Sequence, residues 1–137
     1  MVKILAGPKG TGKTKRLVDL VVASVNAENG DVVVIEKDKT LTYDIPYRAR
    51  LIDAAEYGVN TYDTFKGFLC GIQAGNYDIT HVYIDNFLKI VNDKQLAGLE
   101  AFAAWLDAFS EKNGIEYVLS VSAEADALPA SLKAYII

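Results

Sequence analysis

The chain has 137 residues, 51% of them hydrophobic, so it is long enough to bury a sizeable core. Its formal net charge of -4 argues against a broad basic surface for nucleic acid or anionic lipid. A single cysteine, Cys70, and a single histidine, His81, exclude an intrachain disulfide and an ordinary zinc site. No apolar stretch approaches the roughly 20 residues that span a bilayer. We therefore expect a cytoplasmic protein without a membrane span, for which nucleic acid is not the expected partner.

The N-terminal third of the chain predicts a strand, a helix and a second strand. The apolar run Val2–Ala6 is short and stops at Gly7, which is typical of a buried strand. Residues 14–28 carry leucines and valines at helical spacing, and Asn29-Gly30 ends that pattern. Residues 32–35 are all β-branched, which favours a strand buried on both faces.

Residues 37–60 leave two alternatives open. Residues 41–45 and 48–53 can pair around Pro46-Tyr47, which would give a β-hairpin at about 40–53. The same residues can instead form one irregular excursion. In either case we interpret the segment as an insertion between the second strand and the next helix.

The remainder of the chain continues the alternation of helices and strands. The predicted elements are a helix from about Thr61 to Gly75, a strand at 81–85, a long helix at about 93–113, a strand at 115–121 and a short closing helix at 129–135. Such alternation predicts an α/β fold, a three-layer α/β/α sandwich with a mainly parallel sheet, in one domain over residues 1–137. Ligands of such sheets bind beyond the carboxyl ends of the strands.

One motif carries specific chemistry, because residues 7–14 match GxxxxGK[ST] between a predicted strand and a predicted helix. Glycines allow backbone N–H groups to converge on phosphate oxygens, and the helix start adds its positive dipole end. Lys13 is expected to reach the β and γ phosphates, and Thr14 to bind Mg²⁺. The predicted phosphate-binding residues are Gly7, Pro8, Lys9, Gly10, Thr11, Gly12, Lys13, Thr14 and Lys15.

This motif resembles the phosphate-binding loop of the P-loop NTPase superfamily, and its sequence, GPKGTGKT, is similar to the loop of AAA+ ATPases. The chain has no room for the helical lid of AAA+ proteins. The order of elements resembles the RecA-like, additional-strand class instead. The resemblance implies a Walker B aspartate at the end of an apolar strand, and Asp85 fits that position as a second magnesium ligand. Asn86 follows it, where some P-loop families carry a catalytic glutamate.

The same resemblance suggests two further catalytic residues. In RecA-like ATPases a glutamate after the second strand acts as general base, and this role would fall to Glu36. A solvated strand-end glutamate, or one paired with a nearby lysine or arginine, is the alternative. In the additional-strand class a polar residue near the end of the last core strand senses the γ phosphate, which points to Ser120 or Ser122.

These observations predict an ATP-binding protein that hydrolyses the β–γ phosphoanhydride with Mg²⁺. ATP is favoured over GTP because the chain has no NKxD motif for guanine. Two alternatives stay open: a module that senses ATP or ADP without useful turnover, and a small nucleotide or metabolite kinase. Arg48 or Arg50 could complete a neighbouring subunit's site in a homo-oligomer, but ordinary surface ion pairs are the favoured interpretation of both.

Overall fold

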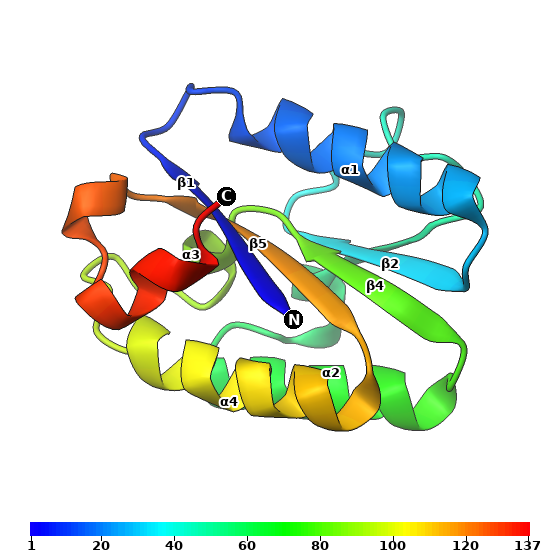
Figure 1. Ribbon diagram of the computed structural model, residues 1–137. Coiled ribbons are helices and arrows are strands. Elements are labelled where there is room, and N and C mark those ends of the chain that lie inside the picture. Colours follow the sequence, from blue (N-terminus) through cyan, green and yellow to red (C-terminus); the bar gives the residue numbers. More distant parts are fainter.

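The computed structural model describes residues 1–137, and its strands form one parallel sheet (Figure 1). The strands are β1 (Val2–Gly7), β2 (Asp31–Glu36), β3 (Arg50–Asp53), β4 (Ile79–Ile84) and β5 (Glu116–Ser122), in the spatial order β1-β5-β4-β2-β3. The helices are α1 (Lys13–Ala27), α2 (Tyr62–Gly75), α3 (Phe87–Ile90) and α4 (Leu99–Asn113). Short 3-10 helices cover Ala54–Tyr57, Ala125–Ala127 and Ala130–Tyr135. None of the helices is both long and apolar enough to cross a membrane.

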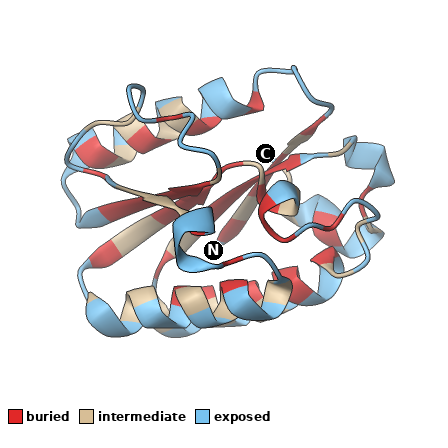
Figure 2. Cartoon of the chain, turned by 180° about the vertical axis from the view of Figure 1, so that it is seen from behind, coloured by how far each residue is buried: buried red, intermediate tan, exposed pale blue.

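The sheet is the middle of three layers, as the sequence predicts. Helix α1 covers one face, and α2 and α4 lie side by side on the other (Figure 1). Successive strand residues point to opposite faces, so Val118 packs toward α1 whereas Leu119 packs toward the other helices. Figure 2 shows the result, with buried strands between helices whose outer surfaces are exposed. The predicted three-layer α/β/α sandwich is therefore confirmed.

The ends of α2 and α4 follow from local sequence signals. Thr61 caps α2 by accepting a hydrogen bond from Thr64 N at 3.0 Å, while Thr64 Oγ1 accepts one from Thr61 N at 3.0 Å. These reciprocal bonds satisfy two backbone donors that the first turn leaves free. Helix α4 ends at Gly114, whose φ of +65° is readily adopted by glycine.

The β-hairpin at about 40–53, one of the two alternatives for this segment, is wrong. Strand β3 runs parallel to β2, with Val33 opposite Arg50 and Glu36 opposite Asp53, and residues 37–49 form the turns between the two strands. Leu41 and Ala49 are buried in the core on the α1 side. Burial of these two side chains anchors the segment to the core, and the short apolar runs that suggested a hairpin serve this purpose instead.

The long helix predicted from residue 93 starts only at Leu99, because Asp93 organises the preceding loop. Asn92 and Leu96 have positive φ angles of 57° and 60°, which no helix allows. The Asp93 carboxylate accepts hydrogen bonds from Tyr62 Oη at 2.6 Å, Gly98 N at 2.9 Å, Ala97 N at 3.1 Å and Gln95 N at 3.2 Å. Four bonds to one buried carboxylate hold the loop in this strained shape.

The outer edge of β1 is partly covered by the last residues of the chain. Ile136 forms a parallel bridge with Ile4, and Ile137 N donates to Ile4 O at 3.0 Å. The predicted closing helix at 129–135 is a 3-10 helix, Ala130–Tyr135, that leads into this bridge. The opposite edge of the sheet is the short strand β3.

Removing the Asp93 carboxylate should destabilise the fold. We expect Asp93→Ala to lower the free energy of unfolding by about 3 kcal/mol, because four partly buried donors lose their acceptor, and Tyr62→Phe to lower it by about 1 kcal/mol. Urea denaturation followed by circular dichroism measures both values. Asp126→Ala, which removes an exposed carboxylate, is the control and should leave stability within about 0.5 kcal/mol of the wild type.

The effect of Asp93 should also depend on pH. Burial raises the pKa of Asp93, but the hydrogen bonds from Tyr62 and the three backbone N–H groups together outweigh burial and hold this pKa below its ordinary 3.8. A lowered carboxyl pKa adds stability that is complete above the unfolded-state pKa and is lost as pH falls through the folded-state value. The stability difference between wild type and Asp93→Ala should therefore shrink below pH 3.8. An unchanged difference in acid would contradict this account.

Candidate functional site

The loop between β1 and α1, residues 7–14, has a backbone that only glycine tolerates at several points. Gly10 and Gly12 have φ angles of +84° and +82°. A Cβ atom on Gly7 would lie 2.6 Å from Thr11 Oγ1, closer than any real contact allows. Thr11 Oγ1 itself donates to Pro8 O at 2.7 Å, which fixes the turn. The glycines thus permit a tight loop that ends directly at the first residue of α1.

The backbone donors of this loop are unpaired. None of the N–H groups of residues 9–15 donates a hydrogen bond to a protein acceptor. They cluster at the start of the 15-residue helix α1, where the helix dipole contributes partial positive charge. Free N–H groups at a helix N-terminus form a site for an anion, and phosphate oxygens fit such a site.

Lys13 adds a full positive charge to the same place. Its side chain is buried, and Nζ donates to Pro8 O at 2.8 Å, so the ammonium group bridges the loop. Burial lowers the pKa of Lys13 below its ordinary 10.5, and the nearby Asp85 charge offsets part of that effect. An anion bound in the loop would stabilise the charged form of Lys13.

Asp85 and Ser120 meet at the carboxyl ends of β4 and β5, opposite the first turn of α1. Ser120 Oγ donates to Asp85 Oδ1 at 2.7 Å and accepts from Asn86 N at 2.6 Å. Thr14 Oγ1 lies 3.3 Å from both carboxylate oxygens of Asp85. The predicted residues Thr14, Asp85 and Ser120 are therefore brought together.

These groups surround one cleft of about 290 Å³ that has no hydrophobic side chain in its wall. The residues that line it are Lys9, Gly10, Gly12, Lys13, Thr14, Asp85, Asn86, Ser120 and Ser122. A ligand pocket is normally lined mostly by hydrophobic side chains, so a wall without any suits a highly charged group. No cluster of three His, Cys, Asp or Glu side chains in the chain could hold a metal on its own.

Glu36 does not line this cleft. Strand β4 lies between β2, which carries Glu36, and β5. Only 1% of Glu36 is exposed, and Oε1 accepts hydrogen bonds from Thr40 N at 2.7 Å, Thr40 Oγ1 at 2.9 Å and Leu41 N at 3.1 Å. In this arrangement the Glu36 carboxylate holds the first turn of the segment that leads to β3.

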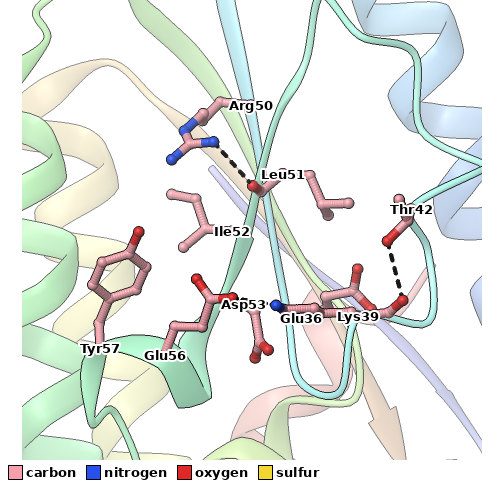
Figure 3. A pocket seen from close by; sticks show the side chains of 9 residues that line it. All are labelled: Glu36, Lys39, Thr42, Arg50, Leu51, Ile52, Asp53, Glu56 and Tyr57. Atoms are coloured by element: carbon pink, nitrogen blue, oxygen red, sulfur yellow. Dashed lines mark hydrogen bonds and ion pairs between the residues drawn. The ribbon is translucent and has the colours of Figure 1, made fainter.

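Glu36 borders a different cavity, of about 160 Å³, beside β3 (Figure 3). Lys39, Asp53 and Glu56 lie close to it there, and Lys39 Nζ pairs with Glu56 Oε1 at 2.5 Å. Arg50 lines this cavity as well. The cavity is small and carries charges of both signs, so it resembles a network of surface ion pairs more than a ligand site.

Two further basic residues lie away from the polar cleft. Lys15 follows Thr14 on α1, where its Nζ pairs with Asp19 Oδ2 at 3.2 Å on the surface. Arg48 pairs with Glu28 at 2.8 Å. The side chains of Lys15 and Arg48 therefore do not line the cleft, although the Lys15 backbone N–H is among the free donors.

Asn86 is the cleft residue to which the sequence assigned no role. It adopts a positive φ of 52° directly after β4, and its side chain makes no hydrogen bond within the protein. It also lines a second cavity of about 600 Å³, which adjoins the cleft and extends along α3. The sequence signal that could have identified Asn86 as a cleft residue is its position directly after Asp85, at the end of β4.

Comparison with known proteins adds no family to these observations. A scan against protein-family models finds no match, and no curated protein matches the chain. The chemistry of the cleft therefore has to be inferred from its own residues.

The lowered pKa of Lys13 gives anion binding a specific pH dependence. The affinity for inorganic triphosphate should fall as pH rises through the folded-state pKa of Lys13, which lies below 10.5. The loss occurs because the neutral amine no longer attracts the anion. Isothermal titration calorimetry at increasing pH measures the affinity.

Lys13→Arg is the matched control for this titration, because a guanidinium stays protonated throughout the range. Any change in its affinity reports titrating groups other than Lys13, including triphosphate itself and Lys9. If wild type and Lys13→Arg show the same pH profile, Lys13 does not provide the titrating charge.

Proposed function

We propose that the chain is a P-loop nucleotide-binding protein that binds ATP with Mg²⁺ in the cleft between residues 7–14 and Asp85. The observation that carries the proposal is the set of free N–H groups in residues 9–15, which flank the buried Lys13 along the chain. Such a site matches the negative charge and the many acceptor oxygens of a phosphate chain. ATP is proposed over GTP because the chain has no NKxD motif for guanine.

The strand order supports membership of the additional-strand class. In that class, an extra strand separates the strand that precedes the phosphate-binding loop from the strand that ends in the Walker B aspartate. Here β5 lies between β1 and β4. Asp85 follows β4 and faces Thr14 across the end of β5.

Thr14 and Asp85 are the residues that would hold Mg²⁺. One hydroxyl and one carboxylate are hard oxygen donors, which this ion prefers, and Mg²⁺ usually takes its remaining ligands from water and phosphate. When bound, Mg²⁺ neutralises part of the charge on the phosphates. Lys13 and the backbone N–H groups supply the rest of the positive field and orient the phosphate chain.

The cleft favours binding over rapid hydrolysis. Its single carboxylate, Asp85, is already hydrogen-bonded to Thr14 and Ser120, and Glu36 borders another cavity. A general base must lie within hydrogen-bond reach of the attacking water. We therefore propose a protein that holds ATP and hydrolyses it slowly, closer to a nucleotide sensor than to an efficient ATPase.

Phosphoryl transfer to a small acceptor is a second candidate function. One observation favours it: the second cavity, of about 600 Å³, adjoins the cleft at Asn86 and Ser122 and has Leu96 and Ala127 in its wall. An acceptor there would lie next to Asn86 and Ser122, which line both the cavity and the cleft. Transfer of radiolabelled phosphate from ATP to added nucleosides or metabolites tests this activity.

Lys13→Ala should weaken Mg²⁺-ATP binding by about 100-fold, because a charge-assisted hydrogen bond to phosphate is lost. Thr14→Val should raise the Mg²⁺ concentration needed for binding, since it removes the hydroxyl ligand. Calorimetric titration with ATP and Mg²⁺ measures both effects. Lys112→Ala, which removes an exposed lysine in the last turn of α4, serves as the control and should bind like the wild type. Absence of ATP binding by the wild type would refute the proposed function.

Glu36→Gln separates the two roles of Glu36. A general base predicts that turnover falls by about 10²-fold or more while ATP affinity is unchanged. We expect instead that turnover stays within about twofold and that the free energy of unfolding falls by about 1 to 2 kcal/mol, because a neutral amide oxygen is a weaker acceptor for the N–H groups of residues 40 and 41. Single-turnover hydrolysis and urea denaturation measure the two quantities.

A further inference from the structure

The polar side chains of the cleft differ in how many of their hydrogen-bonding positions are already filled. Ser120 Oγ gives its only proton to Asp85 and accepts the N–H of Asn86, at 2.7 and 2.6 Å. A hydroxyl has one proton to donate. Ser120, which is only 2% exposed, therefore has no proton left for a phosphate oxygen.

Asn86 is in the opposite situation. Its side-chain amide has two N–H donors and makes no hydrogen bond within the protein. Its backbone is fixed from both sides, because its N–H donates to Ser120 and its carbonyl oxygen accepts from Lys89 N at 3.1 Å. The result is a free amide on a hydrogen-bonded backbone, among the residues that line the cleft.

Asn86 lines the cleft from the end of β4, the strand that β5 separates from β1 and its glycine loop. In the proposed function the free N–H groups of residues 9–15 would hold the phosphate chain at the start of α1, and Thr14 and Asp85 would hold the magnesium. Asn86 and Ser122, which follow Asp85 and Ser120 along the chain, also line the cleft. A diphosphate lacks the terminal phosphate, so any contact that Asn86 makes to that phosphate is absent from bound ADP.

We propose that Asn86 contacts the terminal phosphate of bound ATP, and that Ser120 is a positioning residue for Asp85 and Asn86. This inference rests on the proposed function and reverses the sensing role that the sequence suggested for Ser120. An amide donates to a phosphate oxygen but takes no proton from water. The contact therefore distinguishes ATP from ADP without accelerating hydrolysis.

The affinities for Mg²⁺-ATP and Mg²⁺-ADP test the role of Asn86. Asn86→Gly removes the amide and keeps the positive φ accessible. It should weaken ATP binding by about tenfold and ADP binding by less than about twofold. The matched control is Asn92→Gly, which removes an asparagine of similar φ from the neighbouring cavity but not from the cleft. This control should leave both affinities unchanged.

Variants of Ser120 test the positioning role. Ser120→Ala should raise the Mg²⁺ concentration for half-maximal binding of ATP and ADP by a similar factor, because Asp85 loses its orienting hydrogen bond. Ser120→Thr retains the hydroxyl and should restore the wild-type magnesium dependence. Two results together distinguish positioning from a general structural defect. The shift in magnesium dependence is the same for ATP and ADP, and Ser120→Thr reverses it.

Two results would overturn the inference while leaving the proposed function intact. One is an unchanged ATP-to-ADP affinity ratio in Asn86→Gly. The other is a loss of ATP binding alone in Ser120→Ala, as a direct contact with the terminal phosphate would give. A wild-type protein that binds neither nucleotide would instead refute the proposed function itself, so the two failures are distinguishable.

Discussion

The parallel register of β4 and β5 is the constraint on which the candidate site depends. Ile84 lies opposite Leu119, so the next residues along both strands, Asp85 and Ser120, meet at the sheet edge. Alternation along each strand also sends both side chains to the α1 face, where the chain leaves β1 through its glycine loop. A shift of one residue would turn the Ser120 side chain toward α4 and disconnect it from Asp85.

Much of this arrangement could be predicted from the sequence, because it depends on local patterns. Residues 7–14 combine a motif with a strand before and a helix after it, and both neighbours form as predicted. The apolar run before Asp85 places that carboxylate at the end of β4. Parallel strands direct their carboxyl ends to one edge, so the meeting of residues 14, 85 and 120 follows from the fold class.

The predictions for Glu36 and for the start of α4 failed for a common physical reason. In both cases a carboxylate accepts hydrogen bonds from nearby backbone N–H groups. Glu36 ends its strand at the expected edge, but its carboxylate accepts hydrogen bonds from the N–H groups of residues 40 and 41 and lies outside the cleft. Asp93 bonds the backbone of its own loop and delays the start of α4. Residue type and spacing do not reveal such pairings, because they depend on turns with positive φ at Asp38, Asn92 and Leu96.

The bridge between Ile136 and Ile4 has a consequence for how copies of the protein meet one another. An open strand edge offers unpaired N–H and C=O groups that another chain can extend into a continuous sheet. The C-terminal residues occupy part of that edge on β1. The other edge, β3, has only four residues and carries the charges of Arg50 and Asp53 at its two ends. Neither side of the sheet is a good template for strand addition, so the fold protects itself against aggregation through its edges.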